Sequence, residues 1–236
     1  MPGACEVGIE AVVFDVLGTM VDEAGGLRAA IAEAVSAPGE VPDDPTLDHL
    51  LSAWYAHVGD EQRRMGEGDR PYANSEVIDR EAAERVAALA GLTDPPAIER
   101  LARAAERLTP WEDSAAGLAR LAQDFPVLGL SHASRGALLR LNAHAGLRWH
   151  QALSAEDARA HKPAPEVYRL AIDAAGCPPE RVLMVAAHAW DLRGARAVGM
   201  RTAYVQRPVA DPPRSTDRFD WRAESLDELA AGLAVA

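Results

Sequence analysis

Residues 12–19 read Val-Val-Phe-Asp-Val-Leu-Gly-Thr, an apolar run that carries one aspartate and ends in a glycine and a threonine. A short run of β-branched and apolar residues indicates a strand that is buried on both faces. Asp15 then lies at the carboxyl end of this strand, which is the edge where open α/β sheets bind ligands. A carboxylate displayed there is a candidate nucleophile, although a turn-capping aspartate gives the same local pattern.

The rest of the chain falls into two patterns. Between residues 23 and 109, apolar side chains such as Ile78, Ala82 and Val86 recur at helical spacing, and no strand is evident. From residue 110 onward, strands alternate with helices, which predicts right-handed crossovers and a parallel sheet. Strands are predicted at 126–130, 152–153, 182–185 and 202–205, helices at 115–123, 135–145, 165–175 and 192–198, and a surface loop at 207–219.

These patterns predict an α/β fold, in which helices flank a Rossmann-like parallel sheet and a helical cap is inserted after the first strand. The core domain would comprise residues 1–22 and 110–236, and the cap domain residues 23–109. The 236 residues carry a net charge of −12, which argues against a nucleic-acid-binding protein. We find no signal peptide and no apolar run near the ~20 residues that span a membrane. We therefore expect a cytoplasmic protein with neither nucleic acid nor membrane as a partner.

Polar residues fall at four predicted strand ends or the loops that follow them. They are Asp15, Ser131, Lys162 and Asp191. In a parallel sheet all four would face one crevice. Each alone has an ordinary structural interpretation: Ser131 as a helix cap, Lys162 as a solvated lysine, and Asp191 as a first-turn acid that the helix dipole stabilises. The four residues together indicate a functional site more specifically than any one of them does alone.

On these residues the chain resembles the haloacid dehalogenase superfamily, and within it the type II 2-haloacid dehalogenases. The motifs that carry the resemblance are Phe-Asp-Val-Leu-Gly-Thr (14–19), Leu-Ser (130–131), Lys-Pro-Ala-Pro-Glu-Val-Tyr (162–168) and Met-Val-Ala-Ala-His-Ala-Trp-Asp-Leu (184–192). The resemblance implies a small haloacid as substrate. It also implies a homodimer as one arrangement, although no self-complementary face can be read from the sequence.

Two positions separate the chemistries of this superfamily. Its phosphatases carry a proton-donating aspartate where this chain has Leu17, and an acid that helps hold magnesium where it has Ala186 and Ala187. Magnesium prefers several oxygen ligands in octahedral geometry. The resemblance therefore favours hydrolytic dehalogenation over phosphatase activity, with no metal site and no magnesium cofactor. A phosphatase, or a non-catalytic regulatory protein on this fold, remains an alternative.

The resemblance also implies a role for each site residue. Asp15 attacks the carbon that bears the halogen, Lys162 keeps Asp15 ionised, and Thr19 orients it. Asp191, with His188 nearby, is the candidate for activating water. His188 could instead contact halide or act only as a hydrogen-bonding spacer. The substrate-binding candidates are Leu17, Ser131, His132, Tyr168, Tyr55 and Arg70.

The chain departs from the type II pattern in the cap. Those enzymes usually place an arginine directly after a tryptophan on a cap helix, where the arginine cradles the leaving halide. Here Tyr55 follows Trp54. The nearby arginines are the candidates to replace it, and Arg70 is the one we favour from sequence.

Overall fold

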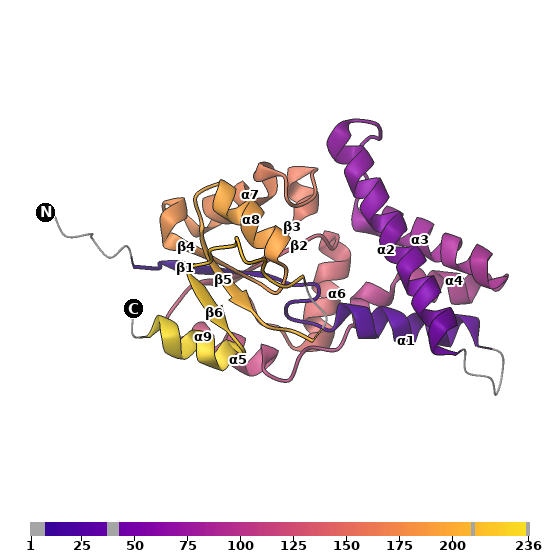
Figure 1. Ribbon diagram of the computed structural model, residues 1–236, viewed down its shortest axis with the longest axis horizontal. Helices are drawn as coiled ribbons and strands as arrows, with labels where there is room; N and C mark the ends of the chain where they lie inside the picture. The colour runs from indigo at the N-terminus through magenta and orange to yellow at the C-terminus, as the bar shows by residue number, and fades with distance from the viewer. Residues whose placement is uncertain (1–7, 37–42, 209–210, 235–236) are drawn as a thin grey trace, which may run out of the picture.

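The computed structural model describes residues 8–36, 43–208 and 211–234 (Figure 1). The opening run forms strand β1 (Ala11–Asp15), in which every residue is buried. This strand lies inside a six-stranded sheet of order β3-β2-β1-β4-β5-β6, whose neighbouring strands are all parallel. The other strands are β2 (Val127–Ser131), β3 (Gln151–Ser154), β4 (Val182–Ala186), β5 (Arg201–Val205) and β6 (Trp221–Ala223). The predicted Rossmann-like α/β fold is confirmed.

Helices cover both faces of the sheet, and each face has its own apolar core (Figure 1). One core joins Phe14 to leucines of α5 (Ser114–Leu121), α6 (Arg135–Ala145) and α9 (Leu226–Leu233). The other joins Val13 to apolar residues of α7 (Pro165–Ala175) and α8 (Ala189–Ala197). Short 3₁₀ helices, η2 (Ala155–Ala158) and η3 (Pro179–Arg181), precede α7 and β4. The strand order reverses beside β1, so a crevice is expected between the ends of β1 and β4.

Residues 23–107, which we call the helical block, contain helices and no strand among the residues described there. The block comprises α1 (Glu23–Val35), α2 (Asp44–Glu67), α3 (Ser75–Ala90), α4 (Pro95–Ala102) and η1 (Ala104–Arg107). An Asp or Asn side chain accepts a backbone N–H at the start of each α-helix, which satisfies one of the donors left free there. The apolar faces of the helices in this block form a third core around Ile31, Trp54 and Val86. Figure 1 shows the block beside the sheet, next to α6.

Two elements near the C-terminus were not predicted. Strand β6 has only three residues, at the edge of the sheet, and α9 follows it directly. The segment 207–219 was predicted as a surface loop, but Arg207 and Asp217 in it are buried. Arg207 Nε donates to the Thr19 carbonyl oxygen at 2.9 Å, and its Nη1 pairs with Asp113 at 2.8 Å. The other described residues of the segment are mostly exposed and form a loop, as predicted, and Arg207 ties this loop to the turn after β1.

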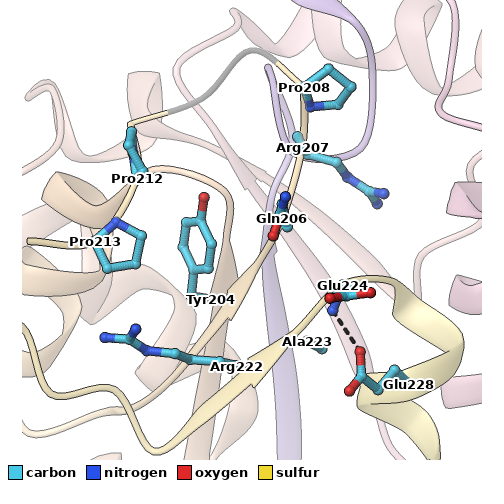
Figure 2. A pocket seen from close by; sticks show the side chains of 10 residues that line it. All are labelled: Tyr204, Gln206, Arg207, Pro208, Pro212, Pro213, Arg222, Ala223, Glu224 and Glu228. Atoms are coloured by element: carbon cyan, nitrogen blue, oxygen red, sulfur yellow. Dashed lines mark hydrogen bonds between the residues drawn. The ribbon is translucent and has the colours of Figure 1, made fainter.

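A pocket of about 580 Å³ lies beside β5 and β6 (Figure 2). It is lined by Tyr204, Gln206, Pro212, Arg222 and neighbouring residues, and by none of the predicted site residues. In Figure 2 the guanidinium of Arg207 points away from Tyr204 and Pro212.

None of the helices that the structure describes is both long and apolar enough to cross a membrane.

We expect Gly194→Ala to destabilise the protein, because a Cβ at Gly194 would lie 2.3 Å from Tyr168 Oη and 2.9 Å from Pro163 Cβ. Overpacking of this kind typically costs about 1–3 kcal/mol. Gly232→Ala in α9 is the matched control, since its new methyl group meets nothing closer than 3.9 Å and a helical Gly→Ala change usually stabilises by about 0.5–1 kcal/mol. Urea unfolding of both variants measures the difference. Equal stability of the two variants would contradict the packing of Tyr168 against α8.

Candidate active site

Asp15 is held at the carboxyl end of β1 by the turn that follows it. Gly18 adopts a positive φ of 76°, which closes the turn and brings Thr19 back toward the strand. The Thr19 hydroxyl donates to Asp15 Oδ2 at 2.7 Å and accepts the Ala187 N–H at 2.9 Å. Thr19 thus fixes one oxygen of Asp15 and joins the ends of β1 and β4. Its own side chain is fully buried and does not reach the cavity described below.

The Lys162 ammonium lies between two buried carboxylates. Its Nζ donates to Asp15 Oδ1 at 2.8 Å and to Asp191 Oδ2 at 2.7 Å. Burial alone would raise the pKa of Asp15, but the charges of Lys162 and His188 bring it below its usual value. Burial would lower the pKa of Lys162, yet the two carboxylates raise it. Asp15 is therefore ionised and Lys162 is charged at neutral pH.

Asp191 is enclosed on all sides. The Tyr168 hydroxyl donates to Asp191 Oδ1 at 2.7 Å, while Lys162 holds the other oxygen. Both Asp191 and Tyr168 are completely buried, and burial raises the pKa of Asp191. Neither residue lines the cavity. Tyr168, which the sequence predicted to contact substrate, instead supports Asp191 on the side away from the cavity. The arrangement lets Asp191 anchor both Lys162 and Tyr168 in a fully buried position.

A cavity of about 310 Å³ opens in front of Asp15, between the end of the sheet and the helical block. Six predicted site residues line it: Asp15, Leu17, Tyr55, His132, Lys162 and His188. Its walls are largely apolar, with Trp54 and Tyr55 from α2 and Trp190 from α8. Among the residues that the structure describes, no arginine lines this space. The cation that holds Asp15 is therefore Lys162.

Ser131 is the last residue of β2, and His132 follows it. Ser131 Oγ is fully buried, accepts the Ala133 N–H at 3.1 Å and does not line the cavity. The Lys162 N–H donates to His132 Nε2 at 2.8 Å. Burial and the charge of Lys162 lower the pKa of His132 to about 3, so the ring is neutral. A neutral ring that accepts at Nε2 carries its proton on Nδ1, so the Gln62 amide, 3.4 Å from Nδ1, should present its oxygen there.

Two predicted contacts are corrected by position. Arg70 does not line the cavity, because its guanidinium is paired with Glu61 at 2.5 Å and with Glu81 at 2.6 Å inside the helical block. Ser131 is fully buried and does not line the cavity, and its hydroxyl oxygen accepts the Ala133 N–H of the following turn. His188 does line the cavity, and its Nε2 lies 3.3 Å from the Leu17 carbonyl oxygen. Since a carbonyl only accepts, Nε2 carries the proton there.

The sequence did not single out two acids of the cavity wall. Glu23 begins α1, directly after the N-cap Asp22, and Asp79 lies one turn after Ser75 on α3. Burial, partly opposed by the charge of His188, raises the pKa of Glu23 to about 7. The only available signal was spacing: Ser75 and Asp79, four residues apart, share one helix face. Ordinary first-turn and surface acids have the same pattern, so no local signal distinguishes Glu23 and Asp79 from them.

Lys162 already fills the position between Asp15 and Asp191 that a divalent cation would need. At this edge, β4 ends with Ala186 and is followed by Ala187, and neither residue supplies a side-chain oxygen. Within the described ranges, no three His, Cys, Asp or Glu side chains are grouped so that they could hold a metal ion. Magnesium prefers six oxygen ligands, so these residues do not fit it.

Residues 9–199 match the family model described as haloacid dehalogenase-like hydrolase. The (S)-2-haloacid dehalogenase H-109 of Pseudomonas putida is 30% identical over 86% of this chain and 88% of its own. A crystal structure of an L-2-haloacid dehalogenase superposes with a TM-score of 0.85 at 30% identity, covering 97% of this chain and all of the other. The enzyme from Xanthobacter autotrophicus with chloropropionic acid covalently bound has a TM-score of 0.79 at 26% identity, over 96% and 98% of the two chains.

We expect Asp79→Asn to stabilise the protein increasingly as the pH rises. Burial and the charge of Glu23 raise the pKa of Asp79 to about 8, so the folded protein keeps a proton that the unfolded chain loses near pH 4. Wild-type stability is therefore lost as the pH rises toward 8. The gain from the substitution should grow to about 1–3 kcal/mol at pH 8.5. Urea unfolding at pH 5 and 8.5 measures it, with Glu84→Gln on the exposed face of α3 as control. A gain of the same size at both pH values would contradict the argument.

Proposed function

The chain belongs to the haloacid dehalogenase-like hydrolases and is a hydrolase of carbon–halide bonds, and we propose that it converts a small 2-haloalkanoic acid to the 2-hydroxy acid through an ester on Asp15. The observation that carries the proposal is the ionised Asp15, which is paired with Lys162 and lines a largely apolar cavity that also includes Leu17. An ionised carboxylate can attack carbon, and an apolar wall suits a haloalkyl group.

In the first step, a carboxylate oxygen of Asp15 forms a bond to the carbon that bears the halogen, and the halide leaves with the bonding electrons. Oδ1 and Oδ2 are held by Lys162 and Thr19, so the carboxylate cannot turn away from the cavity. The covalent adduct in the Xanthobacter enzyme supports this route. The substrate carboxylate would lie near the backbone after Ser131, with Lys162 as the closest fixed cation.

In the second step, water attacks the carbonyl carbon of the Asp15 ester and frees the hydroxy acid. The cavity of about 310 Å³ has the volume of about ten water molecules at ~30 Å³ each, so a short haloacid leaves room for water. Lys162 stays beside Asp15 and offsets the negative charge that develops on the ester oxygen. No step needs a metal ion. A phosphatase is disfavoured because Leu17 cannot protonate a leaving group.

Metal-stripped protein should release halide from fluoro-, chloro- or bromoacetate or from 2-chloropropionate, and Asp15→Asn should lose at least about 10³-fold of that rate because it removes the nucleophile. Ion chromatography of released halide measures both, which also ranks the substrates. Asp173→Asn, the same change at an exposed site of α7, should keep the wild-type rate. Halide release that required added magnesium, or that persisted in Asp15→Asn, would refute the proposed mechanism.

Arg70→Gln should leave the halide-release rate within a few-fold of wild type, because Arg70 lies off the cavity. It should lower stability by about 1–3 kcal/mol, since the buried Glu61 loses a charged partner. Steady-state kinetics and urea unfolding separate the two effects. If Arg70 bound the leaving halide, activity would fall by orders of magnitude while stability changed little.

A further inference from the structure

A second cavity, of about 750 Å³, adjoins the active-site cavity along α2. We call it the outer cavity, and the cavity of about 310 Å³ the inner cavity. Within α2, the inner cavity is lined by residues in the range 54–62 and the outer cavity by residues in the range 59–67. Gly59, Gln62 and Lys162 line both. The two cavities therefore follow each other along one helix and meet at these three residues.

Gly59 keeps the junction of the two cavities free of a side chain. It lies in the interior of α2 (Asp44–Glu67), where glycine is less favourable than alanine because it loses more backbone freedom on folding. Packing does not require a glycine there, since an added Cβ would meet no other part of the described structure within 4 Å. The missing side chain therefore leaves a passage from the inner cavity to the outer one.

The other two residues at the junction are held in place by polar contacts. Gln62 lies three residues after Gly59 on the same side of α2, and its side-chain amide is 3.4 Å from His132 Nδ1. The Lys162 ammonium is held by its ion pair with Asp15 at 2.8 Å. A substrate whose reacting carbon lies at Asp15 can therefore extend past Gly59 without displacing either side chain.

The outer cavity combines apolar walls with a charged rim. Met65, Tyr72 and Ala164 are half-buried in its wall, whereas the four exposed charged residues that line it are two arginines and two glutamates. These charges cancel, and two of them, Arg63 and Glu67, form an ion pair at 2.9 Å. Binding cavities of this size are mostly apolar with a few polar groups. The lining thus suits an uncharged hydrocarbon chain better than a second carboxylate or an ammonium group.

We propose that the outer cavity receives the hydrocarbon chain of the substrate beyond C3, so that the preferred substrates are 2-haloalkanoic acids with an extended, uncharged chain. This inference rests on the proposed dehalogenase function and names the substrate class within it. The carboxylate and the carbon that bears the halogen stay in the inner cavity in front of Asp15, and the chain passes Gly59. Bond formation and hydrolysis at Asp15 are the same for every chain length.

Chain length should act on binding rather than on the chemical steps. Each methylene group removed from water strengthens binding roughly fourfold. Binding that is equal in the ground state and the transition state lowers KM and leaves kcat unchanged. We therefore expect kcat/KM to rise about 10–60-fold from 2-bromopropionate to 2-bromohexanoate, mostly through KM.

The test is the kcat/KM of halide release from bromoacetate, 2-bromopropionate, 2-bromobutyrate and 2-bromohexanoate, with the same enantiomer of each chiral acid. In Gly59→Leu a side chain fills the passage, so the ratio of kcat/KM for 2-bromohexanoate to that for 2-bromopropionate should fall to about one or below. Leucine is a better helix former than glycine, so this variant should fold, which urea unfolding verifies. Ser52→Leu adds the same side chain at an exposed position of α2 that lines neither cavity, and it should keep the wild-type ratio.

Tyr72→Ala tests the wall of the outer cavity itself. Tyr72 lines the outer cavity and not the inner one. Its removal takes away apolar surface that would contact only the far part of the chain. The same ratio should therefore fall several-fold, through KM for 2-bromohexanoate.

A wild-type series in which kcat/KM does not rise with chain length would overturn the proposal. A ratio that either variant leaves unchanged would also overturn it, because the chain would then lie elsewhere. With either result, halide release from bromoacetate would leave the proposed function standing. Absence of halide release from every haloacid would instead refute the proposed function, and the role of the outer cavity with it.

Discussion

The ion pairs of Lys162 with Asp15 and Asp191 are the constraint on which the site depends. They join the end of β1 and the start of α8 to the loop before α7, so three segments distant in sequence share one buried charge cluster. Burying charged groups is costly, and removing one partner of such a pair typically costs about 3–5 kcal/mol. Two carboxylates without the ammonium would repel each other at this edge. The same lysine that stabilises the fold therefore keeps the nucleophile ionised.

The pattern of hydrophobic residues predicted strands β1 to β5 and helices α5 to α8, but not β6 or α9. The runs that became β1, β2, β4 and β5 are buried on both faces, and such strands are nearly continuous in apolar residues. Strand β6 lacks that signal, because it has three residues at the sheet edge and Arg222 in its middle is exposed. Arg207 was assigned to the surface for a related reason. Its partners, Thr19 and Asp113, are far away in sequence, so no local sequence pattern indicates that Arg207 is buried.

The site residues likewise divide into those that a local sequence pattern could place and those that it could not. Strand-end residues could be placed because a parallel sheet brings strand ends together, and Asp15 and Lys162 do meet. Residues whose role depends on which way a side chain faces could not be placed. Tyr168 and Asp191 have the right types and spacing for a site, yet they are packed behind Lys162. Arg70 is an arginine near the tryptophan of α2, yet Glu61 and Glu81 hold it inside the helical block.

The composition of the cavity wall suggests why an arginine is not required there. Type II enzymes, by resemblance, use a cap arginine to cradle halide, whereas this cavity has Tyr55 with Glu23 and Asp79 on the helical side. An ionised acid would repel a haloacid anion, but burial favours the neutral form of both acids at or below neutral pH. A neutral carboxyl can donate a hydrogen bond, as a guanidinium does. Substrate binding would then favour the protonated form of both acids.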